Sequence, residues 1–263
     1  RRLPGEPLSY SEKNSRHADI AASLQKCTEE IILSLARRGK DLYDCENLCL
    51  AGGVALNCVA NGVLSRAGDF KDIWVQTAAN DAGTAIGAAF EGMIKERQSP
   101  AERQKNFSVF LGPSFSDDEM KKAIDEYPLV CKTFQSDDEQ ARQGASLIAE
   151  GNVVALFKGR MEWGPRALGH RSILADPRRV DMREILNERV KHREVFRPFC
   201  PSVLQEDAPD WFDTSHGSVS AAKYMLVAYN AKKERAEEIP AVVHIDGTSR
   251  IQLVEKESTP FYH

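Results

Sequence analysis

A short apolar run that stops at a double glycine is the feature that most constrains the fold of this chain. Residues 48–51 have the length and composition of a buried strand, the glycines follow, and residues 55–66 suit a helix. The same order then returns, with a buried strand at residues 73–75 and a helix rich in small residues at 84–96. Strand, glycine turn, helix, strand and helix in succession predict an α/β fold.

The remaining elements are predicted from helical periodicity, capping motifs and apolar runs. Apolar residues at helical spacing over residues 17–38, closed by Gly39, indicate a long helix. Two capping boxes, which open at Ser116 and Ser136 and each place a glutamate three residues later, predict two further helix starts. We also expect a helix over residues 181–192 and strands at residues 153–157, 224–229 and 251–254.

A polar stretch divides the chain into two predicted domains. Residues 97–106 lack periodicity and contain Pro100, which is typical of a linker. We therefore expect one domain at residues 1–100 and a second at residues 107–263. Strands and helices alternate in each, so the predicted fold class is α/β on both sides of the linker.

Composition excludes some classes of protein. No apolar run approaches the roughly 20 residues that a membrane span requires, so no membrane partner is expected. The six cysteines are scattered, and Cys45 and Cys49 lack the further Cys or His of a zinc site. Reduced thiols in buried positions are the simplest interpretation, and they favour a cytoplasmic protein.

The net charge of −4 conceals a local excess of cations. From Lys158 to Arg197 the chain has eleven Lys or Arg against six Asp or Glu, so this stretch carries +5 and the remainder −9. A concentrated positive charge in an otherwise acidic chain predicts one anion-binding site. The alternative is a solvated basic surface, which explains the charge but not the glycines and aromatic residues among the cations.

Two cationic runs supply the candidate residues of this site. Residues 157–179 follow a predicted strand and are interrupted by glycines, and residues 191–204 lead into a second apolar run. Guanidinium groups bind phosphate oxygens in pairs, and we expect Glu162 to orient one of them. His170 is equally consistent with a structural role. The candidate anion-binding and catalytic residues are Lys158, Arg166, His170, Arg171, Lys191, Arg193 and Arg197.

The double glycine and a later aspartate suggest a second binding site. Gly52 and Gly53 allow the backbone to approach a nucleotide closely, and Asn57 is placed to hydrogen-bond its ribose or base. A tight turn uses glycines as well, so the motif alone is weak. Asp81 follows the predicted strand at residues 73–75, where ligands gather in α/β sheets. A helix N-cap is the alternative role for this aspartate.

These segments resemble the O-carbamoyltransferases that modify nodulation factors and antibiotics. Residues 48–64 and 76–90 are similar to the second half of the ASKHA (actin/hexokinase-like) domain of that family, and residues 157–179 and 191–204 are similar to its YrdC-like C-terminal domain. Residues 240–254 also resemble the family. The resemblance covers essentially all of residues 10–260 and implies half of an ASKHA domain followed by a YrdC-like α/β domain.

The resemblance also implies a reaction. Carbamoyl phosphate and ATP would form carbamoyl-adenylate, and the carbamoyl group would then pass to a hydroxyl of a small-molecule acceptor. Arg250 would join Gly52, Gly53 and Asn57 in binding the ATP cofactor. His244 and Arg250 are also candidates for the donor pocket that contains Lys158 and His170.

Positioning and cationic charge would dominate such chemistry. Lys191, Arg193 and Pro198 resemble, more loosely, the residues that frame the donor phosphate in YrdC-like domains.

A divalent metal such as Fe or Mg is implied too, and Asp81 would be one of its ligands. The family completes this metal site with a His-x3-His motif, and the chain has no histidine pair at that spacing. We therefore expect a C-terminal fragment whose partner is a missing N-terminal segment of the same protein. On this interpretation the fragment lacks acceptor transfer.

Two other functional classes remain open from the sequence. An RNA-binding or tRNA-modification module would use the basic YrdC-like surface, but the acidic remainder of the chain argues against nucleic acid. A sugar kinase or ATPase based on the ASKHA half would leave the arginine-rich segment unexplained.

Overall fold

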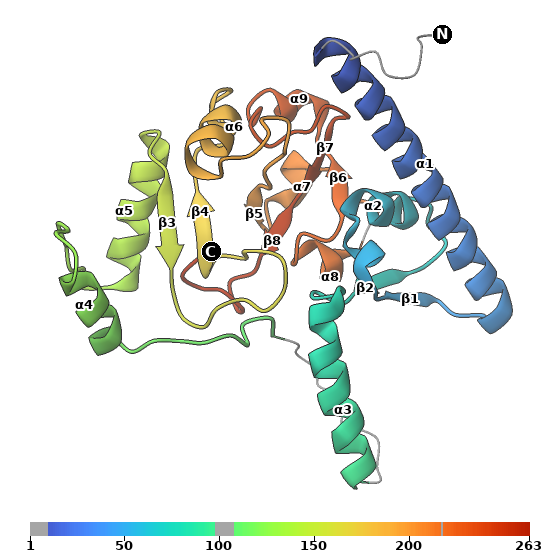
Figure 1. Ribbon diagram of the computed structural model, residues 1–263, viewed down its shortest axis with the longest axis horizontal. Helices are drawn as coiled ribbons and strands as arrows, with labels where there is room; N and C mark the ends of the chain where they lie inside the picture. Colours follow the sequence, from blue (N-terminus) through green and yellow to red (C-terminus); the bar gives the residue numbers. More distant parts are fainter. Residues whose placement is uncertain (1–9, 98–107, 217) are drawn as a thin grey trace.

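The structure is a computed structural model that describes residues 10–97, 108–216 and 218–263. The chain begins with a long helix, α1 (Tyr10–Tyr43), which includes the helix predicted at residues 17–38. In Figure 1, α1 runs along one side of the molecule and lies beside α2 (Cys58–Arg66). No helix within the described residues is both long enough and apolar enough to span a membrane.

The first α/β unit follows the predicted order. Strand β1 (Asn47–Leu50) pairs in parallel with β2 (Asp72–Val75), and α2 connects them. The helix predicted over residues 55–66 is divided, because Asn57 caps α2 and a 3-10 turn, η1 (Gly53–Leu56), precedes it. Gly52 has a φ of +95° at the start of this turn, a backbone conformation that favours glycine.

Helix α3 (Thr84–Arg97) follows a short 3-10 turn, η2 (Asp81–Gly83). It confirms the predicted helix, but none of its residues is buried. Figure 1 shows α3 projecting from the rest of the chain. The linker predicted at residues 97–106 lies almost entirely outside the described residues.

A second group of elements lies on the opposite side of the molecule from α1 (Figure 1). It consists of α4 (Asp117–Asp125), α5 (Asp137–Ala149), and the antiparallel pair β3 (Val154–Phe157) and β4 (Arg171–Leu174). The capping box at Ser116 is complete. At Ser136 the hydroxyl caps the helix, but the Glu139 carboxylate accepts the N–H of Gln135 instead of that of Ser136.

The helix predicted at residues 181–192 begins as α6 (Met182–Ile185) and widens into a π-helix, η3 (Leu186–Val190). The remaining short helices are α7 (Ala208–Trp211), α8 (Val219–Ala222) and α9 (Lys233–Ala236). Two further strand pairs complete the described fold: β5 (Ser202–Leu204) parallel to β8 (Gln252–Val254), and β6 (Ala228–Asn230) antiparallel to β7 (Thr248–Arg250).

One strand is shorter than predicted. The sequence favours a strand over residues 224–229, whereas β6 begins only at Ala228. The turn that follows α8 takes up the earlier residues, with a φ of +58° at Met225 and a hydrogen bond from Leu226 N–H to the Ala221 carbonyl.

The largest hydrophobic cluster contains residues from both sides of the segment 98–107. Asn61 of α2 shows how closely the two sides approach, because its buried amide donates to the Leu226 carbonyl at 2.8 Å. This packing places the start of α2 near β6 and β7. The buried members of the cluster include Leu64, Ile73, Val75, Phe212, Leu226, Val227 and Ile251.

Candidate anion site around Arg166 and Arg250

Two half-buried arginines, which have no acidic partner among the described residues, lie close together. Arg166 belongs to the loop between β3 and β4, and Arg250 is the last residue of β7. Burial, together with the charge of Arg250, lowers the pKa of Arg166. Within the described residues neither side chain forms an ion pair with Asp or Glu, and the Arg166 Nε atom is buried without a hydrogen-bond partner.

Two cysteine thiols are the neighbours of Arg250. Its Nε donates to the Cys200 Sγ at 2.8 Å, and the Cys58 thiol lies close enough to interact electrostatically with this guanidinium. Burial raises the pKa of Cys58, so this thiol is neutral at physiological pH. Neutral sulfur is a weak acceptor and does not offset the arginine charge. The site therefore keeps an uncompensated positive charge, which an anion would stabilise.

His244 lies beside the same arginine. Its Nδ1 is 3.1 Å from the Thr248 hydroxyl, and its Nε2 is buried without a partner. Burial lowers the pKa of this imidazole; Asp246 opposes the shift, while Arg250 and Arg183 add to it. The ring is therefore neutral at pH 7.

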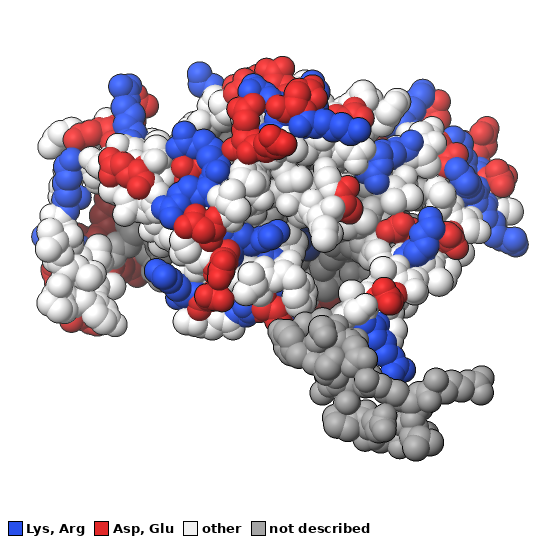
Figure 2. Space-filling view, turned by 90° about the horizontal axis from the view of Figure 1, so that it is seen from above, with Lys and Arg blue, Asp and Glu red and all other residues white. Residues whose placement is uncertain are grey.

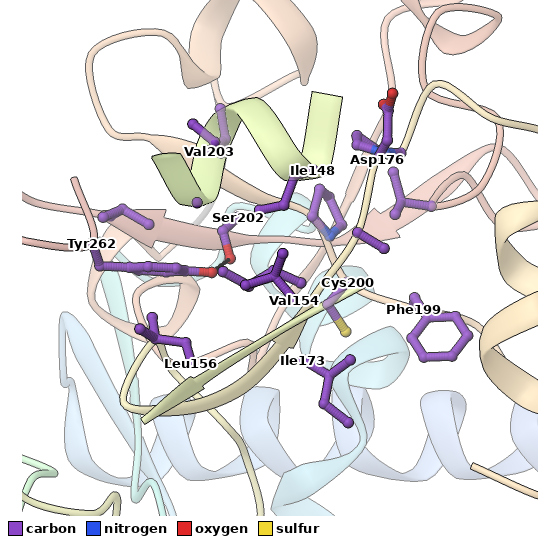
Figure 3. A pocket seen from close by; sticks show the side chains of 18 of the residues that line it. Ile148, Val154, Leu156, Ile173, Asp176, Phe199, Cys200, Ser202, Val203 and Tyr262 are labelled. Atoms are coloured by element: carbon purple, nitrogen blue, oxygen red, sulfur yellow. Dashed lines mark hydrogen bonds between the residues drawn. The ribbon is translucent and has the colours of Figure 1, made fainter. Parts of the chain in front are cut away.

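A cavity of about 640 Å³ adjoins this group. It lies between α5, the β3–β4 pair and the segment before β5, and its walls are mostly apolar. Arg183 and Cys200 line it and also neighbour His244 and Arg250, respectively. Figure 3 shows Cys200 and Phe199 on one side and Tyr262 on another, with the Tyr262 hydroxyl 2.7 Å from the Ser202 hydroxyl.

Arg171 is occupied by the backbone of its own loop. Its guanidinium donates to the carbonyls of Lys158 and His170 and to that of Gly159, at 2.9 to 3.0 Å. The same group lies over the Phe157 ring, 3.6 Å from its centroid. These contacts hold the end of β3 against the start of β4, so the structure assigns Arg171 to the support of the loop.

Lys158 and His170 also have partners inside the protein. Lys158 forms an ion pair with Asp137 at 2.7 Å and lies 4.4 Å from the Phe261 ring centroid. His170 stacks on Phe110 at 3.7 Å, and its Nδ1 is 2.6 Å from the Arg160 carbonyl. For His170 these contacts are those of a structural histidine.

Glu162 has a different role from the predicted one. Its Oε1 accepts the backbone N–H groups of Leu168, His170 and Arg171 at 2.7, 2.9 and 3.1 Å. Burial raises the pKa of this carboxyl, but the backbone N–H donors outweigh it and leave the pKa below its usual value. The carboxylate thus shapes the loop that carries Arg166, and it orients backbone rather than an arginine.

The cations of the second run have partners of their own. Lys191 is exposed, Arg197 pairs with Glu194 at 2.7 Å, and the Arg193 Nε donates to the side-chain Oδ1 of Asn187 at 2.7 Å. Arg193 also lies over the ring of Phe199, 4.9 Å from its centroid, and Phe199 lines the cavity.

The predicted nucleotide turn lies on the surface. Gly52 and Gly53 are exposed, and open space surrounds the position of a Cβ at each. The side chain of Asn57 already has hydrogen-bond partners within the protein. Its Oδ1 accepts the Ala60 N–H at 3.1 Å, and its amide exchanges hydrogen bonds with Gln25 of α1. Its observed role is to cap α2 and to tie it to α1.

Asp81 is exposed at the start of η2, and its backbone carbonyl accepts the Thr84 hydroxyl. The described residues contain no group of three or more His, Cys, Asp or Glu that could hold a metal ion. Asp81 could supply one ligand of the implied metal site, and the described residues alone do not complete it.

Exposed cations elsewhere are paired or interspersed with acids. Arg178 bonds to Asp176 and Arg179 to Asp181, both at 2.7 Å. Figure 2 shows Lys and Arg mixed with Asp and Glu over the face in view, without a continuous basic surface for nucleic acid. The six cysteines are free, as expected, but none is fully buried: Cys27 of α1, Cys49 of β1 and the loop residues Cys45 and Cys131 are exposed.

The sequence pointed to Arg166, Arg250 and His244 but missed Cys58, Cys200 and Arg183. The two thiols are far apart in the sequence, and no spacing rule connects them. Arg183 lies in the predicted helix at 181–192, where it reads as an ordinary exposed charge. The cationic runs at residues 157–179 and 191–204 flank Arg183, and they are the sequence feature that pointed to an anion site near it.

Two family models match this chain. The one described as carbamoyltransferase N-terminus matches residues 4–90, and the one described as carbamoyltransferase C-terminus matches residues 145–263. The chain belongs to the carbamoyltransferase family. Among its relatives, the uncharacterized protein sll1178 of Synechocystis is 41% identical over all of this chain and 45% of its own length.

Two nodulation proteins illustrate the rest of this carbamoyltransferase family. NolO of Bradyrhizobium diazoefficiens is 38% identical over 94% of this chain and 45% of its own length. Nodulation protein U of Azorhizobium caulinodans is 34% identical over 91% of this chain and 40% of its own length. The chain thus spans less than half the length of these relatives.

Proposed function

We propose that this chain takes part in O-carbamoyl transfer and that Arg166 and Arg250 bind the phosphate of the donor. The observation that carries the proposal is a pair of inward-facing guanidinium groups that lack an acidic partner within the described residues. Membership of the carbamoyltransferase family supplies the reaction class. Carbamoyl phosphate fits both observations, because it is an anion that guanidinium groups can bind and it is a carbamoyl donor.

The proposed chemistry proceeds through carbamoyl-adenylate. Water hydrolyses carbamoyl phosphate to carbamate and phosphate, and a carbamate oxygen then attacks the α-phosphorus of ATP and displaces pyrophosphate. The carbamoyl group then passes to an acceptor hydroxyl and releases AMP. Negative charge gathers on phosphoryl oxygens in these steps, so fixed guanidinium groups lower the barrier by electrostatic stabilisation.

The cavity beside the site supports the binding of ATP. Its volume of about 640 Å³ lies in the range of small-molecule pockets. Its apolar wall, which includes Ile173 and Phe199, suits a nucleobase, and Arg183 and Cys200 connect it with the arginine pair. Lys158, His170, Arg171, Lys191, Arg193 and Arg197 stay predictions as ligand contacts.

We propose that a segment of the protein upstream of residue 1 covers α1 and α3. Leu24 and Leu35 of α1 are 67% and 64% exposed, and Phe90 of α3 is 42% exposed. Apolar surface of this extent on soluble proteins marks an interface. The same segment would supply the acceptor pocket and the metal ligands missing beside Asp81. The free thiols fit a reducing, cytoplasmic location.

Pyrophosphate release from ATP in the presence of carbamoyl phosphate tests the assignment. We expect R166A and R250A to lower this rate at least about 10-fold, since each removes a charge-assisted contact. The matched control is R142A, whose guanidinium is exposed and pairs only with Asp138. Equal rates for R166A, R142A and the unmodified protein would rule out the proposed donor site.

A further inference from the structure

His244 has a hydrogen-bond acceptor that no described residue uses. Its ring lies beside Arg250, and its backbone N–H donates to the Thr248 carbonyl at 2.8 Å, which fixes the residue against β7. The Nδ1 atom faces the Thr248 hydroxyl at 3.1 Å. The Nε2 atom is buried and has no partner.

The neighbouring hydrogen bonds determine which nitrogen carries the proton. The Thr248 hydroxyl donates to the Asp246 carboxylate at 2.7 Å, so its oxygen faces Nδ1 as an acceptor. Nδ1 must therefore be the protonated nitrogen of the neutral ring. Nε2 is then a bare lone pair, and a buried acceptor without a donor is unfavourable.

Ligand chemistry limits what can satisfy this lone pair. The phosphate and carbonyl oxygens of carbamoyl phosphate are acceptors that match arginine. Its amino group is the one hydrogen-bond donor of the dianion. When the phosphate of carbamoyl phosphate binds Arg166 and Arg250, its amino group is therefore the one group that can donate a hydrogen bond to the Nε2 of His244.

We propose that His244 Nε2 accepts a hydrogen bond from the amino group of the carbamoyl donor and thereby selects carbamoyl over acyl groups. The inference rests on the proposed function and adds a specificity residue to it. Acetyl phosphate has a methyl group in place of the amino group and is otherwise nearly identical in shape and charge. A site built to hydrogen-bond an N–H rejects the analogue that lacks it, because its buried acceptor stays unpaired.

On this proposal a ligand approaches the ring from the cavity. Arg183 lines the cavity, and its charge acts on His244. Since Nε2 is buried in this structure, the proposal requires a neighbouring side chain to move, and we assign that movement to Arg183. A ligand phosphate that attracts Arg183 provides the force for that movement.

The test compares carbamoyl phosphate with acetyl phosphate as ligands of the protein. We would measure the dissociation constants of both compounds and of inorganic phosphate, for the unmodified protein and for H244L. The H244L substitution should lower the preference for carbamoyl phosphate about 10-fold or more, the effect of one lost hydrogen bond at a desolvated site. It should leave the affinity for inorganic phosphate unchanged.

Two further variants keep the test decisive. H244Q, which restores an acceptor near the Nε2 position, should recover part of the preference. T248V removes the partner that holds the proton on Nδ1, so the preference should fall although the imidazole remains. If H244L does not fold, the ligand preference of T248V decides between the outcomes.

The outcomes separate this inference from the proposed function. An unchanged preference in H244L and T248V, with phosphate affinity still lost in R166A, would overturn the role of His244 alone. Loss of ATP affinity without a change in the carbamoyl preference would also overturn it, because the lone pair would then serve the nucleotide. Failure of the unmodified protein to bind phosphate or carbamoyl phosphate would remove the proposed function itself.

Discussion

Gly169 lies directly against the ring of Tyr262: a Cβ at position 169 would be 2.5 Å from the Tyr262 Cδ1. The backbone of Gly169 also has a φ of +103°, which side chains other than glycine rarely adopt. The loop that carries Arg166 is therefore packed against the C-terminal residues 259–263. The tyrosine hydroxyl continues the contact to Ser202 of β5.

We predict that G169A destabilises the protein by about 1–3 kcal/mol, because both the backbone conformation and the tyrosine ring oppose a methyl group. Thermal or urea unfolding measures this change. G92A is the matched control, since Gly92 is an exposed residue of α3 with nothing within 4 Å of an added Cβ. There alanine should be neutral or stabilising by about 0.5–1 kcal/mol. Similar effects at both positions would contradict the packing.

Glu162 should make the stability of the protein depend on pH. Its pKa is lower in the folded chain than in the unfolded chain, so its contribution is present above the unfolded value of about 4.3. That contribution is lost as the pH falls through the folded pKa. E162Q should weaken the protein at pH 7 by about 1–3 kcal/mol and flatten the loss of stability in acid.

Urea unfolding between neutral pH and the acid range would reveal this dependence. E188Q is the control, because Glu188 is exposed. An E162Q protein with the same acid profile as the unmodified protein would show that the loop does not depend on the carboxylate.

Asn57 should matter through its position at the start of α2. N57A removes a cap and should cost about 1 kcal/mol. N57S keeps an acceptor for the Ala60 N–H but loses the amide contact with Gln25, so its cost should be smaller. Unfolding experiments rank the three proteins. If instead N57S lowers ATP affinity with no loss of stability, the nucleotide role expected from the sequence is the better one.

Arg171 should act mainly on stability. R171A removes the contacts to the carbonyls of residues 158, 159 and 170, and we expect a loss of about 1–3 kcal/mol. Affinity for inorganic phosphate, measured below the unfolding range, should fall far less than in R166A. A loss of affinity equal to that of R166A would place Arg171 in the anion site after all.

The sequence predicts most of the elements because their signals are local. The serine and glutamate at positions 116 and 119 lie within one helical turn, and the capping box forms as expected. Asn57 shows why the prediction of a single helix over residues 55–66 is inaccurate. The side chain of asparagine bonds to the backbone ahead of it and divides a stretch that periodicity joins.

The site is less predictable, because its assembly depends on the path of the loops. Arg166 and Arg171 belong to one glycine-rich run and cannot be ranked by residue type. The structure turns one inward towards Arg250 and uses the other to bind carbonyls. Cys58 and Cys200 give no local signal, since they meet only when α2 packs beside β6 and β7.

The two thiols around Arg250 have a consequence for how the chain responds to a ligand. Cys58 comes before the segment 98–107 and Cys200 after it; Cys200 accepts a hydrogen bond from Arg250, and Cys58 lies near the same side chain. An anion that draws Arg250 towards itself would lengthen its hydrogen bond to Cys200 and move it relative to Cys58. Binding of a phosphate would thus shift the first turn of α2, which carries Cys58. The part of the chain before residue 98 and the part after residue 107 would then both move when a donor binds.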